Sequence, residues 1–113
     1  MAVYVLRTWK LKPGAWPEFQ QLSNDAVWPA IEAAGAKVIG LWQTIIGEGS
    51  EAVLLTRYDD LSMWERTRMV SRDPPEGVDA ELWRRGAEAV VKRQALTEST
   101  HARVLAPSRF RAP

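Results

Sequence analysis

The sequence predicts an α+β fold in which two helical regions cover one face of a four-stranded antiparallel sheet. Four segments are rich in β-branched and aromatic residues, two regions show helical spacing of apolar residues, and a glycine-rich turn separates the middle strands. The resulting order, βαββαβ, is that of the ferredoxin-like arrangement. Because crossover connections are right-handed, both helical regions are expected on the same face of the sheet.

The first half of the chain is expected to supply one strand and one long helix. Residues 3–10 form the strand, which ends at Pro13 and Gly14 because these residues interrupt a ladder. Apolar residues at spacings of three and four predict a helix over 17–34. Pro29 has no backbone N–H, so it is expected to kink this helix or to split it after Trp28.

Three further strands are expected after residue 36. Residues 37–46 and 52–58 are predicted to pair through a hairpin turn over 47–50, and residues 100–105 to form the last strand. Side chains alternate between the two faces of a strand. In the second strand this alternation places Val38 and Trp42 together on one face.

The second helical region is expected in two pieces. Ser62 and Glu65 have the spacing of a capping box, and the proline-containing segment 73–77 must end the helix that they begin. Asp79 is suited to capping the second piece. The apolar face of that piece is predicted to consist of Trp83, Ala87, Val90, Val91 and Gln94. The arginines and lysines of this region, Arg84 and Arg93 among them, are interpreted as solvated helix faces.

Composition limits the classes of function. The chain has 113 residues, a net charge of +1 and no cysteine, which excludes disulfides, thiolate zinc sites and cysteine nucleophiles. We expect one domain over 1–106 and a tail over 107–113. A charge near zero argues against a nucleic-acid partner, and no apolar run is long enough to span a membrane. With no signal peptide evident, we expect a cytoplasmic protein.

Both faces of the predicted sheet are apolar, although the helices can cover only one. In the first strand Val5 lies on the face opposite Leu6, and in the third strand Leu54 lies on the face opposite Leu55. An uncovered apolar face of this size would be unusual on a monomer. We therefore expect a two-fold homodimer in which two sheets pack face to face.

The chain resembles the NIPSNAP family of dimeric α+β barrel proteins. The resemblance is carried by residues 4–14 (YVLRTWKLKPG), 40–47 (GLWQTIIG), 57–61 (RYDDL) and 103–107 (RVLAP). Val5, where many relatives have an acidic residue, and the tail with Arg109 and Arg111 depart from the family pattern. The resemblance implies the ferredoxin-like fold and the dimer, but no catalytic residue. The wider superfamily includes cofactor-free monooxygenases, isomerases and haem enzymes, and eukaryotic relatives are linked with mitochondria and protein partners.

Aromatic residues are the most distinctive part of the composition, with six tryptophans in a small chain. An aromatic-lined pocket would require a few convergent polar groups. The candidate ligand-binding residues are Trp9, Asn24, Trp28, Trp42, Thr44, Tyr58 and Trp64. The alternative interpretation is plain core packing, since aromatic side chains dominate cores through the area that they bury.

Two further residues are candidates for catalysis. Arg7 shares a strand face with Trp9, where it could hold a carboxylate or an enolate-like oxyanion; the simpler interpretation is an ion pair or exposure at a strand end. His101 is the only imidazole and would titrate near neutrality as a general base. Its simpler interpretation is a solvent-facing residue of the last strand. No residue spacing indicates a metal site, and we expect no cofactor.

These observations leave three functions open. The first is a dimeric barrel protein that binds a small aromatic or hydrophobic molecule in an aromatic-lined cavity. The second is a cofactor-independent monooxygenase or isomerase, in which the substrate stabilises its own carbanion. The third is a non-enzymatic module that binds another protein. A haem-binding role rests on analogy with the superfamily alone.

Overall fold

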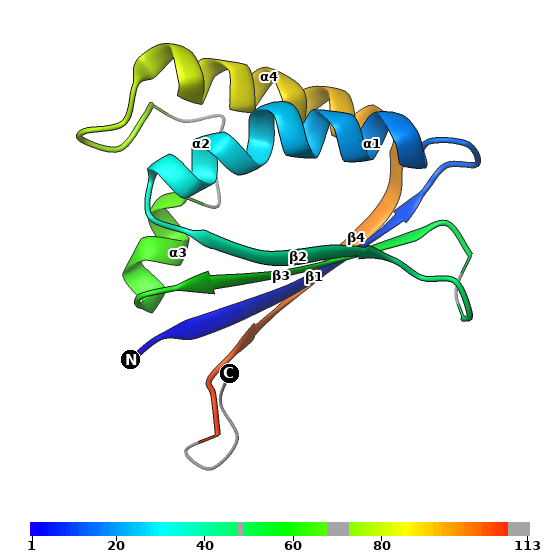
Figure 1. The fold of residues 1–113 in the computed structure, drawn as a ribbon, viewed down its shortest axis with the longest axis horizontal. Helices are drawn as coiled ribbons and strands as arrows, with labels where there is room; N and C mark the ends of the chain where they lie inside the picture. Colours follow the sequence, from blue (N-terminus) through cyan, green and yellow to red (C-terminus); the bar gives the residue numbers. More distant parts are fainter. Residues whose placement is uncertain (48, 68–72, 109–113) are drawn as a thin grey trace.

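The computed structural model describes residues 1–47, 49–67 and 73–108. One antiparallel sheet with the strand order β2-β3-β1-β4 carries its long helices on a single face, as Figure 1 shows. This architecture confirms the predicted ferredoxin-like α+β fold. The elements are β1 (Val3–Leu11), α1 (Trp16–Leu22), η1 (Ser23–Val27), α2 (Trp28–Ala33), β2 (Lys37–Gln43), β3 (Glu51–Tyr58), α3 (Leu61–Thr67), α4 (Ala80–Ala95) and β4 (Thr97–Leu105).

The register of the sheet decides which side chains face the helices. In the β1–β3 pair, Arg7 lies opposite Leu54 and Val5 opposite Thr56, and cross-strand partners share a face. β3 alternates regularly between buried and half-buried residues. Its buried members, which include Leu54 and Thr56, form the inner face toward the helices, and the alternate residues, which include Leu55, form the outer face.

The predicted long helix is divided by a π-helical turn. Trp28 donates its backbone N–H to the carbonyl oxygen of Ser23, five residues earlier, so the interruption comes before Trp28 rather than after it. Proline at position 29 cannot donate to the carbonyl four residues back, and its ring would clash with that carbonyl; widening the preceding turn relieves both problems. The turn directs Ser23, Val27 and Trp28 into the interior, where all three are buried.

The predicted second strand was wrong in two respects. It ends at Gln43 rather than at residue 46, and Ile45 and Ile46 beyond it are exposed. An irregularity in the pairing with β3 lies between Val38 and Gly40, so that Val38 pairs with inner-face Thr56 while Trp42 pairs with outer-face Val53. A bulge of this kind reverses the alternation. Val38 and Trp42 therefore lie on opposite faces of the sheet.

The helix ends follow local hydrogen bonding. Asp79 caps α4 as predicted, because its carboxylate accepts a hydrogen bond from the backbone N–H of Leu82 at 2.9 Å. The cap of α3 was predicted wrongly: the carboxylate of Asp60, and not Ser62, accepts from the backbone N–H of Met63 at 2.8 Å. Asp60 directly precedes Leu61, the first residue of the helix, whereas Ser62 lies within it; a cap side chain at this preceding position can reach the first free N–H groups.

The buried side of α4 differs from the predicted one. Trp83, Gly86, Ala89 and Arg93 are buried, whereas Val91 is 60% exposed. These buried positions recur at spacings of three and four residues, which is the spacing of one helix face. Among the described residues, no helix is long and apolar enough to cross a lipid bilayer.

Candidate functional site

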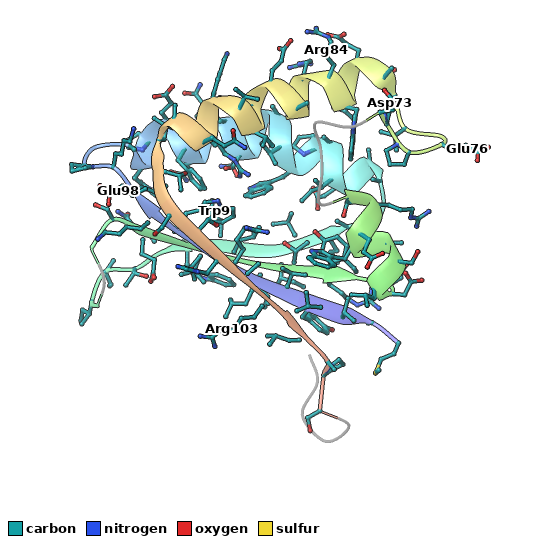
Figure 2. All side chains as sticks on the ribbon, turned by 180° about the vertical axis from the view of Figure 1, so that it is seen from behind. Trp9, Asp73, Glu76, Arg84, Glu98 and Arg103 are labelled. Atoms are coloured by element: carbon teal, nitrogen blue, oxygen red, sulfur yellow. The ribbon has the colours of Figure 1, made fainter. Side chains whose placement is uncertain are left out.

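A cavity of about 230 Å³ lies between the inner face of the sheet and the helices. The strands provide part of its lining with Val5, Arg7, Trp9, Leu54, Thr56, Tyr58, Thr97 and Thr100. The helical segments provide the rest with Val27, Trp28, Ile31, Trp64, Thr67, Val90, Arg93 and Gln94. In Figure 2 the labelled side chain of Trp9 lies in the space between the sheet and the helices. The cavity is therefore lined by aromatic rings, aliphatic side chains and a small number of polar groups.

Arg93 is the most unusual residue of this lining. Its side chain enters from the buried side of α4, and the residue is only 9% exposed. Its Nη1 donates to the hydroxyl oxygen of Ser23 at 3.0 Å. Its guanidinium carbon lies 5.1 Å from the ring centroid of Phe19 and 5.2 Å from that of Trp28. The cation is thus held by aromatic faces and one neutral hydroxyl rather than by a carboxylate.

Arg7 and Arg93 meet at the same aromatic ring. The guanidinium carbon of Arg93 lies 5.1 Å from the ring centroid of Trp9, and that of Arg7 lies 5.9 Å from it. Arg7 also donates from Nη1 to the hydroxyl of Thr100 at 3.2 Å. Burial, with a further contribution from the charge of Arg7, lowers the pKa of Arg93 to about 10. Arg93 remains protonated at neutral pH, so the cavity is electropositive.

The buried polar side-chain atoms that lack a hydrogen-bond partner within the described chain all belong to this lining. They are Nε1 of Trp28, Oγ1 of Thr56 and Nε of Arg93. The two nitrogens can only donate, and the hydroxyl can donate as well as accept. Buried polar groups are normally paired in folded proteins. Three unpaired groups around one cavity indicate that the cavity is shaped to receive hydrogen-bond acceptors.

Tyr58 is the remaining titratable residue of the described lining besides the two arginines. Burial raises the pKa of Tyr58, and a side-chain hydrogen bond with Thr67 and the charge of Arg7 oppose this shift. The phenol is therefore protonated at neutral pH and offers a hydrogen bond rather than acting as a base. No Asp, Glu or His belongs to the described lining of the cavity.

The structure brings together five of the residues that the sequence singled out. Arg7, Trp9, Trp28, Tyr58 and Trp64 all line the cavity. The shared strand face of Arg7 and Trp9 follows from simple alternation. By the same alternation Arg57 turns to the other face, where it forms an ion pair of 2.8 Å with Asp59.

Four of the candidate residues lie outside this cavity. Trp42 lies on the outer face and is 52% exposed, because the bulge in β2 reverses its side and its ring packs over Gly40. Asn24 is exposed on η1, since Ser23 and Val27 take the inward positions of that turn. Thr44 follows the end of β2 and donates to the carboxylate of Glu51 at 2.6 Å.

His101, the fourth of these residues, is exposed on the outer face of the sheet. It pairs with Thr8 in the β1–β4 ladder and lines a separate hollow with Leu6, Thr8 and Arg103. Figure 2 shows the labelled Arg103 on the side of the sheet away from the helices. Since the sheet separates His101 from the cavity, His101 cannot act together with Arg7 on one bound molecule there.

Sequence reasoning missed Arg93, which it assigned to a solvated face. One signal was available: Arg93 lies ten positions after Trp83, and Gly86 and Val90 between them complete a spacing of three and four. Thr56 was missed as well, although it alternates with Leu54 and Tyr58 on β3. A charged residue on the apolar stripe of a helix is the pattern to look for.

The fold and the cavity define the class of protein: a ferredoxin-like α+β domain with an electropositive, aromatic cavity beneath its helices. Within this class, the chain belongs to the NIPSNAP family, whose model matches residues 4–110. A comparison with curated proteins finds no match.

Solved structures agree with this assignment. A NIPSNAP family protein from Agrobacterium tumefaciens is 20% identical, with 97% of this chain and 96% of that chain covered and a TM-score of 0.76. An uncharacterised NIPSNAP-like domain protein from Burkholderia xenovorans is 26% identical, with 99% and 90% covered and a TM-score of 0.74. A putative antibiotic biosynthesis monooxygenase from Nitrosomonas europaea has the same fold at 8% identity, with 96% and 91% covered and a TM-score of 0.70.

Proposed function

We propose that this protein binds a small aromatic or otherwise hydrophobic molecule in the cavity between its sheet and its helices. The observation that carries the proposal is the cavity of about 230 Å³ with Trp9, Trp28, Tyr58 and Trp64 in its lining. Ligand pockets of proteins are mostly apolar and aromatic, with a few polar groups that orient the ligand. This volume is somewhat below the usual range of such pockets, so the cavity has room for a ligand of about one ring.

The six tryptophans allow a direct test. In protein labelled with ¹⁵N-tryptophan, titration with toluene, phenol or benzyl alcohol is expected to shift the indole N–H signals of Trp9, Trp28 and Trp64. The signal of Trp42 serves as an internal control, because that ring lies on the outer face and is 52% exposed. If none of the cavity signals moves with any of these compounds, the protein does not bind small aromatic molecules there.

Two adjacent valines provide a matched pair of variants. Val90 lines the cavity, whereas Val91 is 60% exposed on the opposite side of α4. Val90→Trp should fill the cavity and weaken binding by at least about tenfold, the effect of losing roughly 1.4 kcal/mol of contact. Val91→Trp adds the same ring outside and should leave the affinity unchanged. Equal affinities for both variants would place the binding site elsewhere.

Enzymatic activity is the alternative that the fold suggests, in view of the monooxygenase among the structural relatives. A cofactor-independent monooxygenase or isomerase that uses a general base requires that base near the substrate. The described lining offers two arginines and a phenol whose pKa burial raises, and these groups stabilise anions rather than accept protons. Binding is therefore the function that the described residues support best, and a module without a ligand is disfavoured by the cavity.

The second part of the proposal is a homodimer formed through the outer face of the sheet. Leu6, Val53 and Leu55 are only half-buried there, and Trp42 is exposed. Pairing of two such faces would bury apolar area that the helices leave uncovered. Native mass spectrometry distinguishes this dimer from a single chain of 12.7 kDa. A single chain at micromolar concentration would contradict this part of the proposal and leave the cavity unaffected.

A further inference from the structure

We propose that the ligand of this cavity carries a carboxylate, or an equally delocalised oxyanion, which Arg93 and Arg7 hold beside the ring of Trp9. The inference rests on the proposed function and specifies the chemistry of the molecule bound there. The unpaired donors of Trp28 and Thr56 provide further hydrogen bonds to the oxygens of the same anion. The hydrocarbon part of the ligand lies against the aromatic and aliphatic remainder of the lining.

Charge is the first argument. A buried cation loses its hydration, and proteins normally compensate this cost with a carboxylate or an anionic ligand. Arg93 is 9% exposed, and its recorded hydrogen bond runs to the neutral hydroxyl of Ser23. No acidic residue belongs to the described lining, and residues 68–72, which follow Thr67, contain neither Asp nor Glu. The compensating anion is therefore expected to come from outside the chain.

Other arginines of the same chain show the usual solution. Arg57 pairs with Asp59, and Arg84 pairs with both Glu81 and Glu88. These ion pairs lie on the surface, where water already solvates the charges and the pairs contribute little. Arg93 is buried, and no carboxylate of the described residues pairs with it, although its charge needs compensation far more. A buried guanidinium with aromatic support and without an acidic partner is typical of an anion-binding site.

Donor geometry is the second argument, and it is independent of charge. The unpaired Nε–H of Arg93 and Nε1–H of Trp28 can satisfy their hydrogen bonds only with an acceptor. A carboxylate has two oxygens with about four acceptor positions and no donor, and it matches the planar fork of a guanidinium. A neutral amide of the same shape presents one acceptor and a donor group that would face these donors.

The size of the cavity limits the size of the hydrocarbon part of the ligand. A cavity of about 230 Å³ is small for a ligand pocket, and the anionic group occupies the end at Trp9. Little room remains beyond a single ring or a short branched chain. The expected ligand class is accordingly a monocyclic aromatic or short-chain aliphatic acid, or a compound that presents an enolate in the same position.

The test compares acids with amides of the same shape. Benzoate and benzamide, and phenylacetate and phenylacetamide, are titrated into ¹⁵N-tryptophan-labelled protein while the indole N–H signals of Trp9 and Trp28 are followed. We expect each acid to bind at least about tenfold more tightly than its amide, since the hydrogen bonds between a guanidinium and a carboxylate are charge-assisted and stronger than those to a neutral amide. Equal affinity of acid and amide would overturn the anion inference and leave the proposed hydrophobic site intact.

Variants of two arginines test which residue causes the preference for the acid over the amide. Arg93→Gln keeps a polar side chain of moderate length and removes the charge, so it should reduce the affinity for the acid to that for the amide. Arg84→Gln removes a charge from the opposite side of the same helix and should preserve the tenfold preference. Preference for the acid in folded Arg93→Gln protein would also overturn the inference. Should that variant not fold, Arg7→Gln is expected to reduce the preference, and the wild-type comparison stands by itself.

Failure of the anion inference and failure of the proposed function can be told apart. Toluene, phenol and benzyl alcohol carry no carboxylate, and their binding to the cavity tests the proposed function alone. Binding of these compounds together with equal affinity for acid and amide rejects only the anion. If neither the neutral compounds nor the acids shift the cavity signals, both proposals are rejected together.

Discussion

Two arginines of α4 show how differently the same residue type is used on the two sides of one helix. Arg84 projects into solvent and pairs with Glu81 and Glu88, one turn before and one turn after it. In Figure 2 it is labelled on the side of α4 that faces away from the sheet. Arg93 lies about two and a half turns further along, which brings it to the opposite side of the helix, among aromatic rings.

The comparison shows that position on the helix, rather than residue type, decides whether an arginine of α4 is solvated and paired or buried without a carboxylate partner. Arg84 is solvated and its carboxylate partners are within the chain, so its pairs are a modest surface contribution. Arg93 is desolvated, and its support consists of Trp9, Phe19, Trp28 and Ser23. A buried charge without an ionic partner usually costs stability, and such costs accumulate at functional sites.

The largest expected effect concerns the buried side of α4 itself. Trp83 is 2% exposed, and Trp83→Ala should lower the free energy of unfolding by about 3–5 kcal/mol through lost burial and a residual cavity. Urea denaturation followed by circular dichroism measures the change. Val91→Ala, on the solvent side, should change it by no more than about 0.5 kcal/mol. Similar losses for both variants would contradict the assignment of the two sides.

The second prediction extends the comparison to the two faces of the sheet. Leu55 is half-buried on the outer face, and Leu55→Lys would place a charge within the proposed dimer interface. We expect the dimer dissociation constant to rise about 100-fold, which corresponds to roughly 2.7 kcal/mol. Analytical ultracentrifugation measures it, and Val91→Lys on α4 provides the control. An unchanged dissociation constant in Leu55→Lys would place any dimer interface away from this face.

The third prediction concerns the cost of the buried charge. Arg93→Met retains much of the side-chain volume and removes the charge, so ligand-free protein should become more stable by about 1–3 kcal/mol at pH 7. The matched change Arg84→Met removes two solvent-screened surface ion pairs and should lower stability only slightly. Chemical denaturation of both variants gives the comparison. Destabilisation by Arg93→Met would mean that the aromatic contacts of Arg93 outweigh its desolvation.

The advantage of Arg93→Met should also depend on pH. Burial lowers the pKa of Arg93 to about 10 in the folded protein, so folding disfavours its charged form. Above that pH the unfolded chain binds more protons than the folded chain, and wild-type stability gains relative to the variant. The difference between the two proteins should shrink by about 1 kcal/mol between pH 8 and roughly pH 10.5. A difference that stays constant over this range would count against the desolvated charge.

The smallest predicted effect lies at the start of α4. Asp79 accepts from the backbone N–H of Leu82, and Asp79→Ala should cost about 1 kcal/mol of stability through the lost cap. Asp73→Ala removes an acidic residue that lies outside the helices and should have no measurable effect. Thermal denaturation of the two variants distinguishes a specific cap from a general loss of negative charge.

Much of the fold could be predicted because it follows from local patterns. The strands, their order and the cap at Asp79 rest on alternation, helical spacing and hydrogen bonding between near neighbours. The same alternation placed Arg7 and Trp9 together on one face of the first strand. Two of the errors came where one inserted residue or one missing N–H group changes the period, namely at the bulge of β2 and at the π-helical turn before Pro29.

The sequence by itself determined the βαββαβ order, the apolar character of both sheet faces and the positions of the aromatic residues. It could not determine which of those residues share a space, because that depends on how α4 and η1 settle on the sheet. Packing of these helices turned Arg93 inward beside Arg7, and it covered the face of the sheet opposite to His101 and to Trp42, whose side the bulge in β2 had reversed. Alternation and spacing act over a few residues, whereas Ser23 and Arg93 meet across 70 positions, and only tertiary packing brings such residues together.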